Sequence, residues 1–208
     1  MPSTAFQTKS VSVREYYDIE ATAQERSDYY AGEMFNMAGG TTEHAAITAN
    51  LLRELGLALK GKPCRPLSAD QRLKSEQNGL RIYPDASVFC EPLTYDEEDG
   101  QKHTTTNPTA IFEVLSDGTE AYDRGFKFES FRSTPSLQAY ILIAQDRPHV
   151  EVFDRSADRV WTLTEANGLD SSIPIGGIEI SLHLADLYER IEFSVEDSSE
   201  GRIFPKGP

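Results

Sequence analysis

The stretch Ala110-Ile111-Phe112-Glu113-Val114-Leu115 has the composition of a buried β-strand that carries a single charge. A similar hydrophobic run from Arg81 to Phe89 contains Asp85, which follows a proline. A carboxylate on the apolar face of a strand is costly to bury unless a cation or hydrogen bonds compensate it. Two such carboxylates on neighbouring strands would repel each other, and a divalent metal ion would relieve that repulsion. Asp85 and Glu113 therefore predict a metal site built on a β-sheet.

Length and composition indicate one globular domain. The chain has 208 residues, of which 38% are hydrophobic and 26% charged, and these values suit a soluble domain with a sizeable core. We expect a flexible N-terminus at 1–10, the folded domain at 11–193 and a polar C-terminal tail at 194–208. Apolar runs are too short for a membrane helix, and the polar start of the chain lacks the core of a signal peptide. A cytoplasmic protein without a membrane partner is predicted.

The charge balance limits the ways in which the chain could bind nucleic acid. A formal net charge of −14 argues against broad, non-specific binding, which depends on many contacts from lysine and arginine. A local basic surface is still compatible with this total. Much of the acid lies in two stretches, Asp96 to Asp99 and Glu196 to Glu200, which we expect to be a loop tip and a solvated tail.

The two cysteines, Cys64 and Cys90, lie far apart and form no CxxC pair. We expect them to be free thiols in a reducing cytoplasm rather than a structural disulfide.

Local patterns predict alternating helices and strands. Ser12-Val13-Arg14-Glu15 has the form of a capping box, and Thr41 or Thr42 can cap a long helix. Asn78-Gly79 predicts a hairpin turn. The expected helices are 13–20, 42–60, 122–132 and 184–191; the expected strands are 27–38, 65–74, 80–90, 109–115, 137–144, 149–154, 160–164 and 178–180, with a long loop at 92–108. This order predicts an α/β (α+β) fold, in which a mixed β-sheet is flanked by helices.

Four more polar residues are candidates for the same site. Asp123 and Lys127 stand at i and i+4 on the helix after the Glu113 strand, so they share a face near the end of that strand. His44 continues the apolar stripe of the long helix at its N-terminus and should point inward. Glu33 is the one charge in an apolar row along the strand at 27–38.

The ordered set of motifs resembles the Uma2 family of restriction-type endonucleases, within the PD-(D/E)XK nuclease superfamily. The superfamily usually places its lysine two residues after the second acid, where this chain has Leu115; Lys127 matches a variant with the lysine on the following helix. The resemblance covers about residues 11–190. It rests on Ser12-Val13-Arg14-Glu15-Tyr16, Tyr30-Ala31-Gly32-Glu33, Glu43-His44, Tyr83-Pro84-Asp85, and Phe112-Glu113-Val114-Leu115-Ser116 leading to Asp123 and Lys127.

The resemblance implies a restriction-endonuclease-like mixed sheet and metal-dependent hydrolysis of phosphodiester bonds, with DNA as the expected substrate. Asp85, Glu113 and the carbonyl of Val114 would hold Mg²⁺ or Mn²⁺, which prefer oxygen ligands. Lys127 would orient or activate the attacking water, or stabilise the phosphorane charge. Accessory roles fall to Glu33, His44 and Asp123. Enzymes that cut both strands of a duplex often act as symmetric dimers, so a homodimer is expected.

Simpler explanations exist for each candidate residue. Asp85 could be a turn acid, and Glu113 could be a buried glutamate paired with Arg72 or Arg81. Lys127 could form an exposed salt bridge with Asp123. His44 and Glu33 could be structural, and the other histidines (His103, His149 and His183) are expected at the surface or in loops. At the level of function, the alternatives are a non-catalytic binding or regulatory protein that keeps the nuclease fold, and a hydrolase acting on RNA or a nucleotide.

Overall fold

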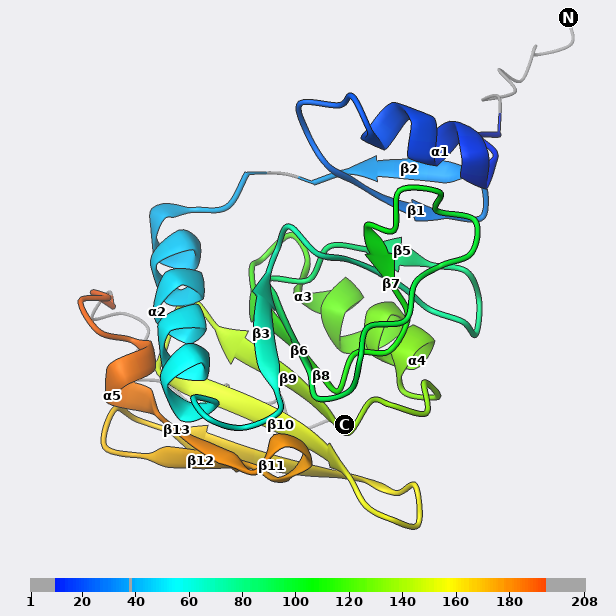
Figure 1. Cartoon of the computed structure of the whole chain (residues 1–208). Helices are drawn as coiled ribbons and strands as arrows, with labels where there is room; N and C mark the ends of the chain where they lie inside the picture. The colour runs from blue at the N-terminus through cyan, green and yellow to red at the C-terminus, as the bar shows by residue number, and fades with distance from the viewer. Residues whose placement is uncertain (1–9, 38, 194–208) are drawn as a thin grey trace, which may run out of the picture.

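The computed structural model describes residues 10–37 and 39–193, and the terminal segments expected to be flexible or polar lie outside these ranges except for Ser10. Figure 1 shows the arrangement of the elements. The helices are α1 (Val13–Glu20), α2 (Thr42–Ala58), α3 (Glu120–Tyr122), the π-helix η1 (Asp123–Lys127), α4 (Phe128–Phe131), the 3₁₀-helix η2 (Gly176–Ile178) and α5 (Leu184–Leu187). The strands are β1 (Ser27–Tyr30), β2 (Glu33–Asn36), β3 (Arg65–Ser68), β4 (Arg72–Lys74), β5 (Arg81–Ile82), β6 (Ala86–Phe89), β7 (Thr104–Thr105), β8 (Ala110–Leu115), β9 (Ala139–Ala144), β10 (His149–Arg155), β11 (Trp161–Asn167), β12 (Ser172–Ile175) and β13 (Ile180–His183).

The strands form a large sheet, a small sheet and a short ribbon. The large sheet has the order β11-β10-β9-β8-β6-β3, and β8 and β9 at its centre run parallel while the other pairs are antiparallel. The small sheet has the order β2-β1-β5-β4-β7, and β12 pairs with β13. The predicted mixed sheet flanked by helices is confirmed. Within the described ranges, no helix is both long and apolar enough to cross a lipid bilayer.

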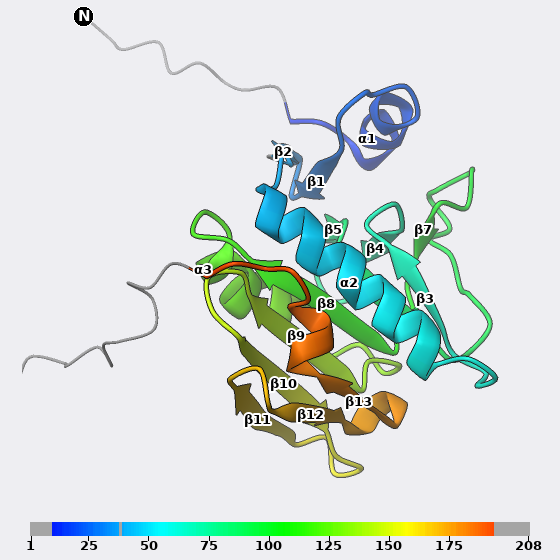
Figure 2. The ribbon, with the colours of Figure 1, turned by 90° about the vertical axis from the view of Figure 1, so that its left-hand side faces the viewer.

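Helices cover both faces of the large sheet. On one face, α2 lies across the sheet, as Figure 2 shows. Its buried stripe Ile47, Leu51 and Leu55 packs against alternate residues of β8 and β9. On the other face, the segment α3-η1-α4 packs its aromatic side chains against the intervening residues, among them Ile111 and Tyr140. Both cores therefore meet at β8, and side chains on that strand are removed from water on either face.

The helix starts follow the sequence signals. The Ser12 side chain accepts a hydrogen bond from Glu15 N, and the Glu15 carboxylate accepts one from Ser12 N, as a capping box requires. The Thr41 hydroxyl accepts a hydrogen bond from His44 N at 3.1 Å and caps α2.

Two of the predicted strands are each divided between the sheets. The segment 65–74 contributes β3 to the large sheet and β4 to the small one, and 80–90 contributes β5 to the small sheet and β6 to the large one. The chain crosses from the small to the large sheet between β5 and β6, where Pro84 interrupts strand hydrogen bonding. Asp85 therefore lies at the junction of the two sheets.

The prediction of free thiols is wrong, because Cys64 and Cys90 form a disulfide. Cys64 precedes β3 and Cys90 follows β6. Extending the register of these strands by one step beyond the Arg65–Phe89 pair places the two cysteines opposite each other. Residues opposite each other on antiparallel strands are close enough for a disulfide. The spacing of the cysteines along the chain does not reveal the register of the strands, so the disulfide could not be predicted from it. The cysteines therefore no longer support the expectation of a reducing compartment.

The acidic stretch 96–99 is also not a solvated loop tip. Asp96 and Asp99 are buried and anchor the long loop to the small sheet, whereas Glu97 and Glu98 between them are exposed. Asp96 Oδ2 lies 2.7 Å from Arg81 Nη2, and Asp99 Oδ2 lies 3.2 Å from Arg72 Nη2. Both arginines are thus engaged by this loop, and the alternative that pairs either of them with Glu113 is wrong.

Candidate metal and active site

Glu113 is the buried acid of β8. It faces the α3-η1-α4 side of the sheet with Ile111 and Leu115, and only 3% of its surface is exposed. Its Oε1 atom lies 3.0 Å from Lys127 Nζ. Burial raises the pKa of Glu113 well above its ordinary value, and Lys127 opposes this effect while Asp123 and Asp85 add to it.

Asp85 is held beside Glu113 by the backbone of β8. Its Oδ2 atom accepts a hydrogen bond from Val114 N at 2.7 Å. Extending the β6–β8 register by one step beyond the Ala86–Phe112 pair places Asp85 opposite Glu113. The two acids predicted to form a metal site are therefore neighbours, and the repulsion predicted between them contributes to the rise in the pKa of Glu113.

Lys127 comes from the π-helix η1, on the turn that packs against β8. Its Nζ atom lies 2.7 Å from Asp123 Oδ1, in addition to its contact with Glu113. The predicted i, i+4 pair with Asp123 exists, but it is buried and not exposed. Burial lowers the pKa of Lys127, and the charges of Glu113, Asp123 and Asp28 outweigh that effect and raise it well above its ordinary value. Lys127 is therefore a cation at neutral pH.

His44 reaches the site from the first turn of α2. Its Nε2 atom lies 3.3 Å from Asp85 Oδ2, and both side chains are partly exposed. The hydrogen bond with Asp85 raises the pKa of His44 above 6.5, burial opposes the rise, and hydrogen bonding to the backbone of Val114 adds to it. His44 thus places a proton beside Asp85 at the more open end of the cluster.

The structure places Glu33 outside this cluster and brings in Asp28 instead. The chain turns at Ala31 and Gly32, and Glu33 is an exposed residue opposite Tyr30 in the β1–β2 register. Asp28 is buried on β1, and its Oδ1 atom accepts a hydrogen bond from Tyr83 N at 3.2 Å. Burial raises the pKa of Asp28 to about 6, and the charge of Lys127 opposes the rise.

The predicted strand places Glu33 on the wrong face because it omits a turn. If 27–38 were one continuous strand, side chains would alternate along its whole length, and residues 29 and 33 would lie on the same face. A turn at Ala31-Gly32 breaks that alternation, because glycine readily takes the positive φ of 89° observed at Gly32. Glu33 then shares a face with Tyr30 and Asp28 rather than with Tyr29, and Asp28, farther from the turn, is the buried acid of that face.

The site can therefore hold a divalent cation. Three acids (Glu113, Asp123 and Asp28) lie around the buried Lys127, and Asp85 lies beside Glu113, so the cluster has more acidic groups than the one lysine can pair with. Among the described residues, no hydrogen bond of good geometry reaches Glu113 Oε1 or Asp123 Oδ1, although both lie at ion-pair distance from Lys127. Buried acceptors without hydrogen bonds are costly, and a hard cation with oxygen ligands would satisfy them.

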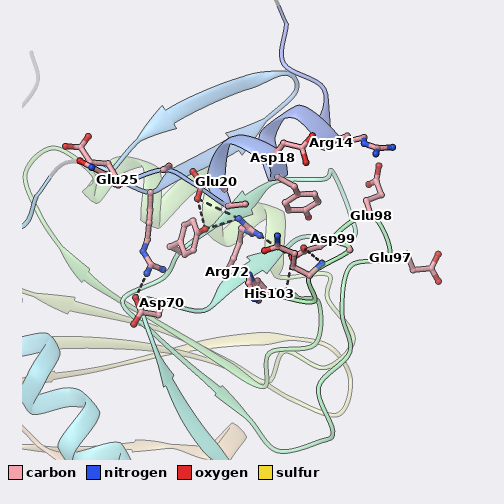
Figure 3. A pocket seen from close by; sticks show the side chains of 18 residues that line it. Arg14, Asp18, Glu20, Glu25, Asp70, Arg72, Glu97, Glu98, Asp99 and His103 are labelled. Atoms are coloured by element: carbon pink, nitrogen blue, oxygen red, sulfur yellow. Dashed lines mark hydrogen bonds and ion pairs between the residues drawn. The ribbon is translucent and has the colours of Figure 1, made fainter.

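A polar cavity of about 830 Å³ lies away from this cluster, between α1, β4 and the loop at 97–103. Figure 3 shows Arg72 in its wall, with Glu20 and Asp99 beside it. Arg72 Nη1 also donates a hydrogen bond to the Tyr83 hydroxyl at 2.9 Å. These partners satisfy the guanidinium internally, and acidic side chains predominate around the cavity. It is therefore poorly suited to bind a phosphate.

Comparison with known proteins first indicates a nuclease-like fold. A solved structure from Anabaena variabilis ATCC 29413, described as a "putative nuclease belonging to DUF820", matches with a TM-score of 0.65 at 18% sequence identity. The match covers 83% of this chain and 96% of that chain. At this identity the likeness shows a shared fold and nothing further.

The family follows from the sequence comparison. The family model Uma2, described as "Putative restriction endonuclease", matches residues 13–185, and the chain belongs to that family. Two proteins of Synechocystis sp. (strain ATCC 27184 / PCC 6803 / Kazusa) are similar over nearly their whole length. "Uncharacterized protein sll1609" is 34% identical over 83% of this chain and 97% of its own length. "Uncharacterized protein slr1290" is 29% identical over 92% of this chain and 97% of its own length.

Proposed function

We propose that this protein is a metal-dependent endonuclease that hydrolyses phosphodiester bonds in DNA. The observation that carries the proposal is the convergence of acids from β1, β8 and η1 on one buried, charged lysine, with Asp85 of the β5–β6 junction beside the β8 acid Glu113. Membership of the Uma2 family and the nuclease-like fold support it. The family description adds restriction-type cleavage of nucleic acid as the expected class of reaction.

Asp85, Glu113 and the carbonyl of Val114 would hold Mg²⁺ or Mn²⁺. When bound, such an ion polarises the scissile phosphate and lowers the pKa of a bound water. The hydrogen bond from Val114 N fixes the Asp85 carboxylate on one side, so its remaining lone pairs are oriented for a ligand. Glu113 is held in the same way by Lys127.

Lys127 would stabilise negative charge rather than act as a base. Its pKa is raised well above the ordinary value by the surrounding acids, so it has no tendency to accept a proton at neutral pH. A fixed ammonium next to the metal ligands can orient the attacking water and stabilise the extra negative charge of the phosphorane. His44, at the more open end of the cluster, would donate a hydrogen bond to a phosphate oxygen, or would give up its hydrogen bond with Asp85 so that Asp85 can bind the ion.

The proposal is tested by cleavage of supercoiled plasmid, linear duplex, single-stranded DNA and RNA at fixed salt with Mg²⁺ or Mn²⁺. Wild-type protein and the Glu33→Gln variant should cut DNA, whereas Asp85→Asn and Lys127→Met should lose at least about 100-fold in rate, the scale of one strong electrostatic contact. Glu33→Gln is the matched control, because it removes an exposed carboxylate from the same domain. Equal cutting by wild type and Asp85→Asn would show that the activity comes from elsewhere.

A second candidate function is a non-catalytic binding or regulatory role on the same fold. It is favoured by the burial of Lys127 Nζ between two carboxylates and by the net charge of −14. This alternative predicts a folded protein that gives no Mn²⁺ binding heat at the cluster. A calorimetric Mn²⁺ signal in the wild type that disappears in Glu113→Ala would exclude it.

We also propose that the protein acts as a homodimer in the cytoplasm. β11 is the edge of the large sheet, and Leu163 on this strand is 47% exposed. A free sheet edge with exposed apolar residues is suited to pairing with a second copy. Sedimentation at several concentrations tests this, and a monomer at every concentration would contradict it.

A further inference from the structure

A second group of possible metal ligands lies on β10 and β11, on the same face of the large sheet as Glu113. It consists of His149 and Glu151 on β10 and Glu165 on β11. The expectation that His149 lies at the surface is wrong, because only 7% of it is exposed. We propose that these three side chains form a second divalent-metal site, which takes a borderline transition ion such as Zn²⁺ and is separate from the Asp85–Glu113 pair.

The strand register explains why these residues meet. His149 and Glu151 are two apart on β10 and therefore share a face, while Val150 and Val152 point into the core on the other side. Glu165 stands directly opposite Glu151 in the β10–β11 register. Like charges in directly opposite positions destabilise a sheet unless a cation lies between them.

The donor atoms already have the spacing of metal ligands. His149 Nε2 lies 3.0 Å from Glu151 Oε1 and 3.6 Å from Glu165 Oε1. Bonds of about 2.0–2.2 Å to one ion place neighbouring ligand atoms roughly 3–3.6 Å apart in tetrahedral or octahedral geometry. A metal ion could therefore be accommodated with small side-chain movements, and it could enter past Glu165, whose side chain is 50% exposed.

Asn167 orients the imidazole for metal binding. His149 Nδ1 lies 2.7 Å from Asn167 Oδ1, an atom that can only accept a hydrogen bond, so the proton of the neutral ring is on Nδ1. Nε2 of that neutral ring presents a lone pair toward the two carboxylates, and a cation bound to all three groups would remove the repulsion between them. A histidine whose second ring nitrogen donates to an oxygen is the usual outer-shell arrangement of metal-binding imidazole.

Arg124 keeps Glu151 ionised without blocking the site. Its Nη2 atom donates to Glu151 Oε1 at 2.7 Å, and its Nη1 atom donates to Oε2. Each carboxylate oxygen has two lone pairs, so Oε1 can accept from Arg124 and still bind an ion.

The second site is distinct from the first one but lies in the same row across the sheet. Glu113 pairs with Leu142 of β9, and Leu142 pairs with Glu151. Two strand spacings separate the acids by about 10 Å, which is too far for one ion to be shared. In the first site the proposed ligands are all oxygens and His44 pairs with Asp85, whereas in the second site the imidazole is itself a proposed ligand. Mg²⁺ and Zn²⁺ should therefore divide between the two sites.

Isothermal titration of tag-free protein with Zn²⁺ in excess Mg²⁺ tests the proposal, with Co²⁺ absorption as a second readout of imidazole ligation. We expect one Zn²⁺ per chain in wild type, in Asp85→Asn and in the matched surface control Glu91→Gln. His149→Ala and Glu165→Gln should abolish that binding, and Asn167→Ala should weaken it about 10- to 100-fold, as loss of an outer-shell partner does.

Three results would overturn the proposal: no Zn²⁺ binding by the wild type, unchanged binding in both His149→Ala and Glu165→Gln, or loss of binding in Asp85→Asn alone. Glu165→Gln alters an exposed side chain and should fold normally, so the test does not depend on the buried His149→Ala variant. None of these measurements requires nuclease activity, and their outcome is therefore independent of the proposed function.

Discussion

Glu113 on β8 and Lys127 on η1 form a buried ion pair, with Oε1 and Nζ 3.0 Å apart. The pair ties the strand at the centre of the large sheet to the helix that covers it. Since Lys127 also contacts Asp123, one ammonium compensates acids from two elements. The contact on which the proposed chemistry depends therefore also matters for stability.

Lys127→Met should destabilise the protein by about 3–5 kcal/mol at pH 8, because it leaves buried carboxylates without their cation. Adding Glu113→Gln to this variant should restore part of the lost free energy of unfolding, because the buried Glu113 carboxylate that had lost its cation is then replaced by a neutral amide. Urea unfolding of the two single variants and the double variant measures the coupling between the residues. Strict additivity of the two effects would mean that the pair is not coupled in solution.

Asp28→Asn should stabilise the protein at alkaline pH. Burial raises the pKa of Asp28 from 3.8 to about 6, so the folded protein holds this proton more tightly than the unfolded chain does. Stability associated with this group is therefore greatest at low pH and falls as the pH rises through the folded pKa. The amide of the variant would keep an acceptor for Tyr83 N–H but carry no charge. We expect a gain of about 1–3 kcal/mol at pH 8 and little change below pH 4.

Thermal or urea unfolding of wild type and Asp28→Asn across this pH range checks the prediction. Asp18→Asn is a suitable control, because Asp18 is an exposed acid on α1. A constant difference between wild type and Asp28→Asn at all pH values would show that Asp28 does not titrate with a raised pKa.

His44 should make metal binding depend on pH. Its pKa is raised by the hydrogen bond with Asp85, so its favourable effect on stability is fully present below pH 6.5 and is lost as the pH rises through the folded value. The protonated imidazole competes with a metal ion for Asp85. Mn²⁺ affinity should therefore rise with pH, by up to about tenfold per unit, and level off once His44 is neutral.

Calorimetric titrations with Mn²⁺ at several pH values measure this dependence. In His44→Gln, the Mn²⁺ affinity should no longer change with pH above the range in which the acids themselves titrate. His103→Gln changes an exposed histidine, so its Mn²⁺ affinity should depend on pH as in wild type. An identical pH dependence in wild type and His44→Gln would assign the effect to another group.

The sequence is sufficient to predict the elements whose signals are local. The capping box at Ser12, the cap at Thr41 and the buried stripe of α2 are all properties of neighbouring residues, and all are confirmed. The convergence of Asp85, Glu113 and Lys127 is also predictable, because a charge on an apolar strand face requires a partner. For such features, burial and periodicity contain the needed information.

Features that depend on register or on pairing between distant segments could not be predicted. The Cys64–Cys90 disulfide and the Glu151–Glu165 pair follow from strand register, which the spacing along the chain does not reveal. The burial of Asp96 depends on Arg81 and Lys74, which come from strands of the small sheet. Glu33 is misplaced because a continuous strand over 27–38 omits one turn, and every later residue of the hairpin then changes face. Asp28 escapes prediction because its burial depends on contact with Tyr83, far along the chain.

The disulfide should make stability sensitive to reductant. Cys64 and Cys90 are 26 residues apart, and closing a loop of that size in the unfolded chain stabilises the folded state by about 3–4 kcal/mol in the chain-entropy model. The double variant Cys64→Ser, Cys90→Ser should therefore be less stable than oxidised wild type by about this amount and should match reduced wild type. Urea unfolding with and without reductant measures both differences. If oxidised wild type and the double variant unfold at the same urea concentration, the two sulfurs are not joined in solution, and β3 is held at the edge of the sheet by its pairing with β6 and its contact with α2.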